Sequence, residues 1–119
     1  YGNIIALNEH GAVLHYTNLD RKRPAALRSF LIDAGAQVHG YASDITRTHG
    51  AGDERFEALI DRMHAMQLEI VDQVVAGIDY RYLHIATHGM LAAVLVDAEL
   101  ASGDPDSLLE ILGEAAEAA

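Results

Sequence analysis

Two aspartates, Asp33 and Asp44, lie inside apolar stretches of the chain: residues 30–32 (Phe-Leu-Ile) precede the first, and Ile45 follows the second. Apolar flanks of this kind predict two neighbouring strands joined by the Gly35–Gly40 segment. Antiparallel pairing of these strands would place the two carboxylates nearly opposite each other, where like charges repel. A bound cation removes this conflict, and carboxylate oxygens suit hard ions such as Mn²⁺ or Mg²⁺. A pair of such ions can hold an attacking water and polarise a carbonyl group.

A structural role is the more common one for aspartates in such a pattern. Asp33 begins an Asp-Ala-Gly sequence, and an aspartate in such a sequence often accepts a hydrogen bond from its own backbone within a turn. Asp44 shortly precedes Arg47 and could pair with that guanidinium group instead of a metal. Spacing alone does not decide between a metal site and these local roles.

His15 is the third residue with possible chemistry. It lies in the run Ala12–Tyr16, which predicts a strand returning from a first strand at residues 3–7 through a turn at Asn8–Gly11. A lone histidine in a strand most often has a structural or surface role. The functional alternative is a polar group, presented from a rigid strand, that donates a hydrogen bond or carries a proton near neutral pH.

His84 and His88 are four positions apart, a spacing that allows metal binding on one face of a helix. No glutamate follows His84, so the helical motif of zinc proteases is not met. We therefore favour a packing or capping role for both residues, and the same interpretation applies to His64.

Two long helices are expected after the strands. The first runs from Glu54 to Val75, with Asp53 as its N-cap and Gly77 beyond its end. The second runs from about Tyr80 to Leu100. The first helix carries an apolar stripe that we expect in the core, formed by Phe56, Leu59, Ile60, Met63, Met66, Ile70 and Val74.

A short third helix is expected over residues 107–119, capped by Asp106 or Ser107. It is acidic and rich in alanine, and its apolar face is weak.

Composition narrows the class of protein. The chain has 119 residues, of which 50% are hydrophobic, so it can form one domain with a modest core. Its formal net charge of −10 argues against binding to nucleic acid, and its apolar runs are too short to span a membrane. It has no cysteine and no signal peptide, which fits a cytosolic protein. It begins with Tyr1 instead of Met, which suggests a fragment or a processed chain.

Three segments, residues 3–17, 28–35 and 40–48, resemble the metallopeptidases of the pita-bread fold. Among these, the chain is most similar to bacterial Xaa-Pro dipeptidases (prolidases) and to the related organophosphorus acid anhydrolases. The resemblance runs from Tyr1 to about Leu100. It implies an α+β fold class, namely half of a pita-bread (creatinase/aminopeptidase-like) catalytic domain in which antiparallel strands are followed by two long helices.

The resemblance also implies an activity and a metal site. The family hydrolyses dipeptides with a C-terminal proline through a water that bridges two divalent metal ions, usually manganese. Two aspartates, one histidine and two glutamates hold these ions. The two aspartates of the family motif fall on Asp33, which would hold one metal, and on Asp44, which would bridge both.

Four further positions gain a role from the resemblance. His15 matches a histidine that lines the active site and contacts substrate, and Leu14 matches a position in the pocket wall. Tyr1 and Tyr80 match tyrosines that line substrate pockets in the anhydrolase relatives.

The sequence departs from the family in extent. The family's remaining ligands, one histidine and two glutamates, come later in the catalytic domain, and its N-terminal domain comes earlier. Residues 1–119 are therefore expected to be the N-terminal half of a catalytic domain whose parent is cytoplasmic and homodimeric. Alone, this half is expected to bind manganese weakly, to be nearly inactive, and to associate through exposed apolar surfaces. The alternatives are a non-catalytic pita-bread binding module and a proline-specific aminopeptidase.

Overall fold

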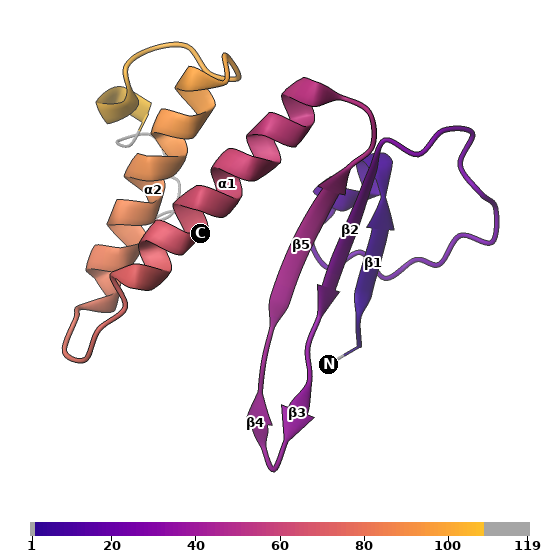
Figure 1. The fold of residues 1–119 in the computed structure, drawn as a ribbon, viewed down its shortest axis with the longest axis horizontal. Helices are drawn as coiled ribbons and strands as arrows, with labels where there is room; N and C mark the ends of the chain where they lie inside the picture. The colour runs from indigo at the N-terminus through magenta and orange to yellow at the C-terminus, as the bar shows by residue number, and fades with distance from the viewer. Residues whose placement is uncertain (1, 109–119) are drawn as a thin grey trace. The chain divides into compact units, whose positions relative to one another are not determined.

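A computed structural model describes residues 2–108 of the chain. Antiparallel strands come first and two helices follow, which confirms the expected order (Figure 1). The elements are β1 (Ile4–Leu7), the 3₁₀-helix η1 (Asn8–Ala12), β2 (Ser29–Ala34), β3 (Gln37–Val38), β4 (Tyr41–Ala42), β5 (Ile45–Gly50), α1 (Glu54–Asp72) and α2 (Tyr80–Asp97). The chain divides into two compact units, residues 1–60 and residues 61–119, and each is described by itself.

The first unit is built on a three-stranded antiparallel sheet in the order β1-β2-β5. Strand β2 is central, so its backbone pairs with a strand on each side, and its side chains are half-buried. Asp33 pairs with Ile4 of β1 and with Thr46 of β5. This register determines which side chains share a face of the sheet, because successive side chains of a strand point to opposite faces.

The connection from β2 to β5 contains a hairpin of its own, formed by β3 and β4, which extends beyond the sheet (Figure 1). Its turn is formed by His39 and Gly40, with φ angles of 50° and 86°. Positive φ at both central residues is typical of a type I′ turn, which matches the twist of the flanking strands. Gln37 pairs with Ala42, so the hairpin continues the register in which β2 pairs with β5.

The predicted strand at Ala12–Tyr16 is wrong. The partner of β1 is β2, and the chain turns away from the sheet at Asn8, whose φ is 54°. Beyond this point the side chain of Asn8, instead of a further strand residue, forms hydrogen bonds with the backbone next to β2. Its Oδ1 accepts from the backbone N–H groups of Arg28 (2.7 Å) and Ser29 (3.2 Å), and its Nδ2 donates to the carbonyl of Ala26 (2.9 Å). Residues 8–12 form η1 because Asn8 bonds to the start of β2 and releases the following chain.

Helix α1 begins as expected. Asp53 Oδ1 accepts from the backbone N–H of Phe56 at 3.1 Å, which confirms Asp53 as the N-cap. The helix ends at Asp72, earlier than the predicted Val75, because the last turn tightens: the N–H of Gln73 donates to the carbonyl of Ile70, three residues back.

Helix α2 begins at Tyr80, as predicted, with the Asp79 carboxylate accepting from the N–H of Arg81 at 2.9 Å. It ends at Asp97, short of the predicted Leu100. The N–H of Leu100 donates to Leu95, the N–H of Glu99 donates to Val96, and Glu99 has a φ of 59°. This is a Schellman motif with a glutamate in the left-handed position, where glycine is usual, so no glycine marks the end of the helix in the sequence.

The second unit contains residues 61–72 of α1 and all of α2, and the ion pair between Arg62 and Asp97 joins these two helices. Its buried side chains include Met66, Leu83, Ala92 and Val94. Only Met66 of the predicted apolar stripe belongs to this buried set, and Val74 is 60% exposed because α1 ends before it.

The predicted cap of the third helix is also wrong. Asp104 accepts from the backbone N–H of Ser107 at 3.0 Å and also from its hydroxyl group, so the cap lies before the predicted Asp106. Pro105 then takes the first helical position, which suits its fixed φ. The rest of that predicted helix, residues 109–119, lies outside the described residues. Within residues 2–108, no helix has the length and apolarity to cross a membrane.

Candidate functional site

Asp33 and Asp44 lie on the same face of the sheet. Asp33 pairs with Thr46, and Asp44 precedes Thr46 by two positions on the same extended stretch. The extension through Asp44 is supported on both sides: Ala34 pairs with Ile45, and the N–H of Ser43 donates to the carbonyl of Ala36 at 2.9 Å. The two aspartates are therefore diagonal neighbours, offset by two residues, and not directly opposite as the sequence suggested.

The face that carries these aspartates is mixed in character. Thr46 lies on it directly opposite Asp33, and Thr48 and Ser29 continue it along β5 and β2. Ile4, Leu31 and the buried Ala6 share the same face. The opposite face includes Phe30, whose ring stacks on His49 at a centroid distance of 6.0 Å, together with Ile5, Leu7, Ile32, Ala34 and Arg47. The aspartates therefore share their face with apolar side chains of β1 and β2.

The two carboxylates fit part of a metal site. Diagonal neighbours of a sheet have Cβ atoms on the order of 7 Å apart, close enough for both carboxylates to reach ions held between them. Within residues 2–108, no group of three or more histidine, cysteine or acidic side chains gathers in a geometry that could hold a metal. The described residues therefore supply two ligands of a centre that needs more donors.

His15 lies in a turn after η1 and not on a strand. Its φ of 54° is in the left-handed region, which a histidine adopts at a cost unless neighbouring contacts hold it there. Leu14, the predicted pocket-wall residue, is 84% exposed.

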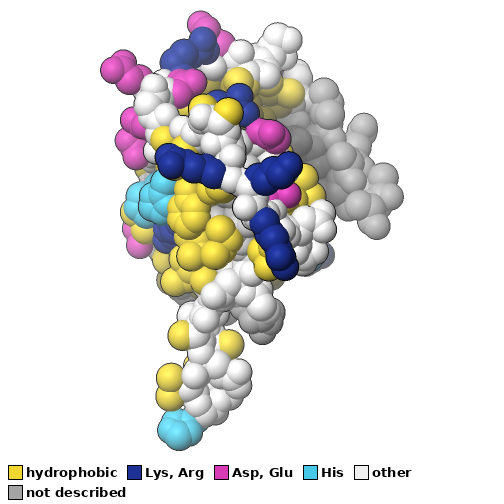
Figure 2. Space-filling model, turned by 90° about the vertical axis from the view of Figure 1, so that its right-hand side faces the viewer, with side chains coloured by type: hydrophobic (Ala, Val, Ile, Leu, Met, Phe, Trp, Pro, Cys, Tyr) yellow, Lys and Arg dark blue, Asp and Glu magenta, His cyan; other side chains and the backbone are white. Residues whose placement is uncertain are grey.

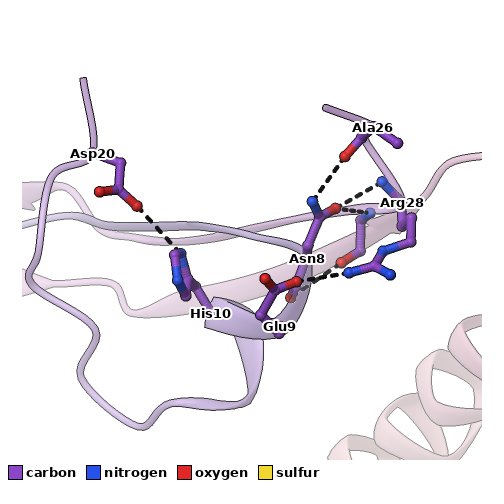
Figure 3. Close-up of polar contacts among 7 residues, drawn as sticks. Asn8, Glu9, His10, Asp20, Ala26 and Arg28 are labelled. Carbon is purple, nitrogen blue, oxygen red and sulfur yellow. Dashed lines mark hydrogen bonds and ion pairs between the residues drawn. The ribbon is translucent and has the colours of Figure 1, made fainter. Parts of the chain in front are cut away.

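The segment around His15 is held by a polar cluster that sequence reasoning did not identify (Figure 3). The ring of His10 stacks on Tyr16 with centroids 4.5 Å apart, and His10 Nδ1 lies 3.8 Å from a carboxylate oxygen of Asp20. Glu9 forms an ion pair with Arg28 at 2.7 Å. In the sequence, the composition of residues 8–11 indicates a turn, but it does not show which side chains this turn brings together.

Electrostatics in this cluster follow from its contacts. Hydrogen bonding to its own backbone lowers the pKa of Glu9, and the charge of Arg28 lowers it further. Burial raises the pKa of Tyr16, and the carboxylate of Asp20 raises it further because it disfavours a nearby phenolate.

Tyr80 is the first residue of α2 and is 79% exposed. It belongs to the second unit, so its relation to the aspartates is not described. Tyr1 lies outside the described residues. His84 and His88 have ring centroids 4.3 Å apart on one face of α2.

Comparison with known proteins decides the family. Residues 1–107 match the model of metallopeptidase family M24. This chain belongs to that family. Among curated M24-type relatives, an Xaa-Pro dipeptidase of Shewanella sp. (strain ANA-3) is 54% identical over 110 residues, and one of Xanthomonas campestris pv. campestris (strain B100) is 56% identical over 110 residues. Each match covers 92% of this chain and 25% of the relative, so the chain spans about a quarter of the length of these relatives.

Solved structures give the same fold for this M24 chain. The aminopeptidase PepP of Pseudomonas aeruginosa matches with a TM-score of 0.83 at 30% identity, over 95% of this chain and 26% of that one. A variant of aminopeptidase P from Escherichia coli matches with a TM-score of 0.81 at 25% identity, with the same coverage. The strands and helices described above are thus those of part of a pita-bread domain, which confirms the expected fold class.

Proposed function

We propose that this chain is the part of an Xaa-Pro dipeptidase that supplies the first two metal ligands of a dinuclear centre. The observation that carries this proposal is the diagonal placement of Asp33 and Asp44 on one face of the sheet. Identity above 50% to curated Xaa-Pro dipeptidases supports the substrate class, a dipeptide with a C-terminal proline.

The residues have distinct roles in this proposal. Asp33 would hold one ion, and Asp44, at the end of the connection into β5, would contribute to holding both. Divalent ions held there, expected to be manganese, would supply the Lewis acidity and the activated water that hydrolysis of the amide bond needs. His15 donates a hydrogen bond to the substrate, and Leu14, Tyr1 and Tyr80 line the pocket.

The chain alone is expected to be nearly inactive. A hard cation takes about six oxygen ligands, and two carboxylates leave water to supply most of them. The scarcity of further ligands among residues 2–108 supports this expectation. A cytoplasmic location and a homodimeric parent complete the proposal, and both rest on the family resemblance.

A chimeric enzyme tests the function directly. Residues of this chain replace the matching 110 residues of the Shewanella dipeptidase, and hydrolysis of Xaa-Pro dipeptides is measured with manganese present. We expect activity, and its loss on Asp33→Asn or Asp44→Asn, while Asp53→Asn keeps it because asparagine also caps a helix. A folded chimera that binds no metal would contradict the proposal and favour a non-catalytic module.

A proline-specific aminopeptidase is the second candidate, because the matching solved structures are aminopeptidases. The same chimera separates the two, since an aminopeptidase needs a longer peptide substrate. Hydrolysis of Xaa-Pro-Xaa tripeptides in preference to dipeptides would favour this candidate.

A further inference from the structure

The loop of residues 13–27 carries Leu14 and His15 but contains no regular helix or strand. Three contacts tie it to η1, and Figure 3 shows two of them, those made by Asp20 and by Ala26. Tyr16 stacks on His10 with an angle of 17° between the ring planes, Asp20 lies 3.8 Å from His10 Nδ1, and the carbonyl of Ala26 accepts from Asn8. The loop is thus fastened near its beginning, its middle and its end.

The stacking contact encloses His15. His10 and Tyr16 lie on either side of residues 11–15, so the stacked rings close this short stretch into a compact turn. The N–H of Val13 donates to the carbonyl of His10 at 3.1 Å inside it. Tyr16 follows His15 directly, so the stacking of the Tyr16 ring also restrains the backbone of His15.

Apolar burial does not hold the segment. Leu14 is 84% exposed and Leu19 is 86% exposed, so neither side chain anchors the loop in a core. Exposed hydrophobic side chains are a general feature of this molecule, and Figure 2 shows them at its surface beside lysine and arginine side chains. The positive φ of His15 also has to be maintained by surrounding contacts. The side chains that can do so are those of His10, Tyr16 and Asp20.

We propose that His10, Tyr16 and Asp20 form a clasp that positions His15 for the peptide substrate. His10 stacks on Tyr16 and lies beside the Asp20 carboxylate, and Asp20 also interacts with Tyr16, so each member contacts the other two. The clasp residues are positioning residues and do not touch substrate. This inference rests on the proposed role of His15, but the order of the loop can be measured without activity.

Backbone order is measured first, by ¹⁵N relaxation on the full chain. In the unmodified chain we expect residues 13–16 to have order parameters of about 0.85, and His10→Ala to lower them below about 0.6. His10→Phe keeps a stacking ring without the ion pair and should give intermediate values. His64→Ala, an exposed histidine on α1, is the matched control and should change nothing in the loop. An unchanged loop in His10→Ala would overturn the clasp.

Kinetics are measured next, in the chimeric dipeptidase. Because a small misplacement of a positioning group lowers catalysis strongly, His10→Ala should lower kcat by on the order of ten- to a hundredfold, with KM changed much less. If the loop loosened and kcat stayed unchanged, the proposal that the clasp positions His15 for catalysis would be wrong. The proposed dipeptidase function would not be affected by that result. A chimera without any activity would instead count against the proposed function, and the relaxation data would still decide whether the clasp orders the loop.

Discussion

Asp33 and Asp44 occupy one face of the sheet with a two-residue offset, because Asp33 pairs with Thr46 and not with Asp44. In a directly opposed pair the carboxylates would repel at short range. The diagonal offset leaves more room between the two carboxylates for ions, and Thr46 lies beside them on the same face, directly opposite Asp33. The register of β2 against β5 is therefore the feature that makes a shared metal site possible.

Metal affinity tests this arrangement. We expect the full chain to bind Mn²⁺ weakly in a calorimetric titration, and each of Asp33→Asn and Asp44→Asn to weaken binding further by about tenfold or more, since each removes a charged oxygen ligand. Asp53→Asn removes a carboxylate outside the site and should leave the titration unchanged. Equal binding by all three variants would show that manganese binds elsewhere on this acidic chain.

Asn8 is expected to be important for stability. Its side chain makes three hydrogen bonds to residues 26–29, and each contributes about 1 kcal/mol to the free energy of unfolding. Asn8→Gly should therefore destabilise the protein by about 2–3 kcal/mol. Asn8→Ala should cost about 1 kcal/mol more, because alanine does not tolerate the φ of 54°.

Chemical denaturation measures both variants of Asn8. The difference between Gly and Ala isolates the backbone contribution from the hydrogen bonds. If both variants were as stable as the unmodified chain, the Asn8 side chain would not be what anchors η1 to β2.

The sequence was sufficient for features that depend on local pattern. The apolar run at residues 30–32, the Asp53 cap and the start of α2 at Tyr80 were all predicted and found. The similarity to pita-bread metallopeptidases predicted the order of strands and helices. These features could be predicted because each depends on one short stretch of sequence.

The features that the sequence did not reveal depend on long-range contacts. The run Ala12–Tyr16 has strand-like composition, yet it forms no strand because Asn8 bonds to residues 26–29, far along the chain. The His10–Asp20 contact is hidden for the same reason. The exact register of Asp33 against β5 also had to be observed, since a shift of one pair changes which residues face each other.

Acid should loosen the start of α2. Hydrogen bonds from the Arg81 side chain and backbone lower the pKa of Asp79 below its ordinary value of 3.8. A carboxylate with a lowered pKa in the folded state adds stability above its ordinary pKa and loses it as the pH falls through the lowered value. We therefore expect this contribution to be complete above about pH 5 and to disappear as the pH falls below 3.8.

Amide exchange of Tyr82 and its neighbours, measured between pH 3 and 6 and corrected for the intrinsic rate, would follow this change. The Asp79→Asn variant is the control, because asparagine caps the helix without titrating. A pH dependence that persisted in Asp79→Asn would assign the effect to another group.

Glu99 provides a last test of the backbone. Its φ of 59° at the end of α2 places a residue with a side chain where glycine is favoured, and the left-handed conformation costs roughly 1–2 kcal/mol for residues other than glycine. Glu99→Ala removes the side chain and its contacts but keeps this cost, whereas Glu99→Gly removes both. Glu99→Gly should therefore be more stable than Glu99→Ala by about 1 kcal/mol in thermal or denaturant unfolding. Equal stability of the two variants would mean that α2 does not end in the left-handed turn described here, because only that turn distinguishes glycine from alanine at this position.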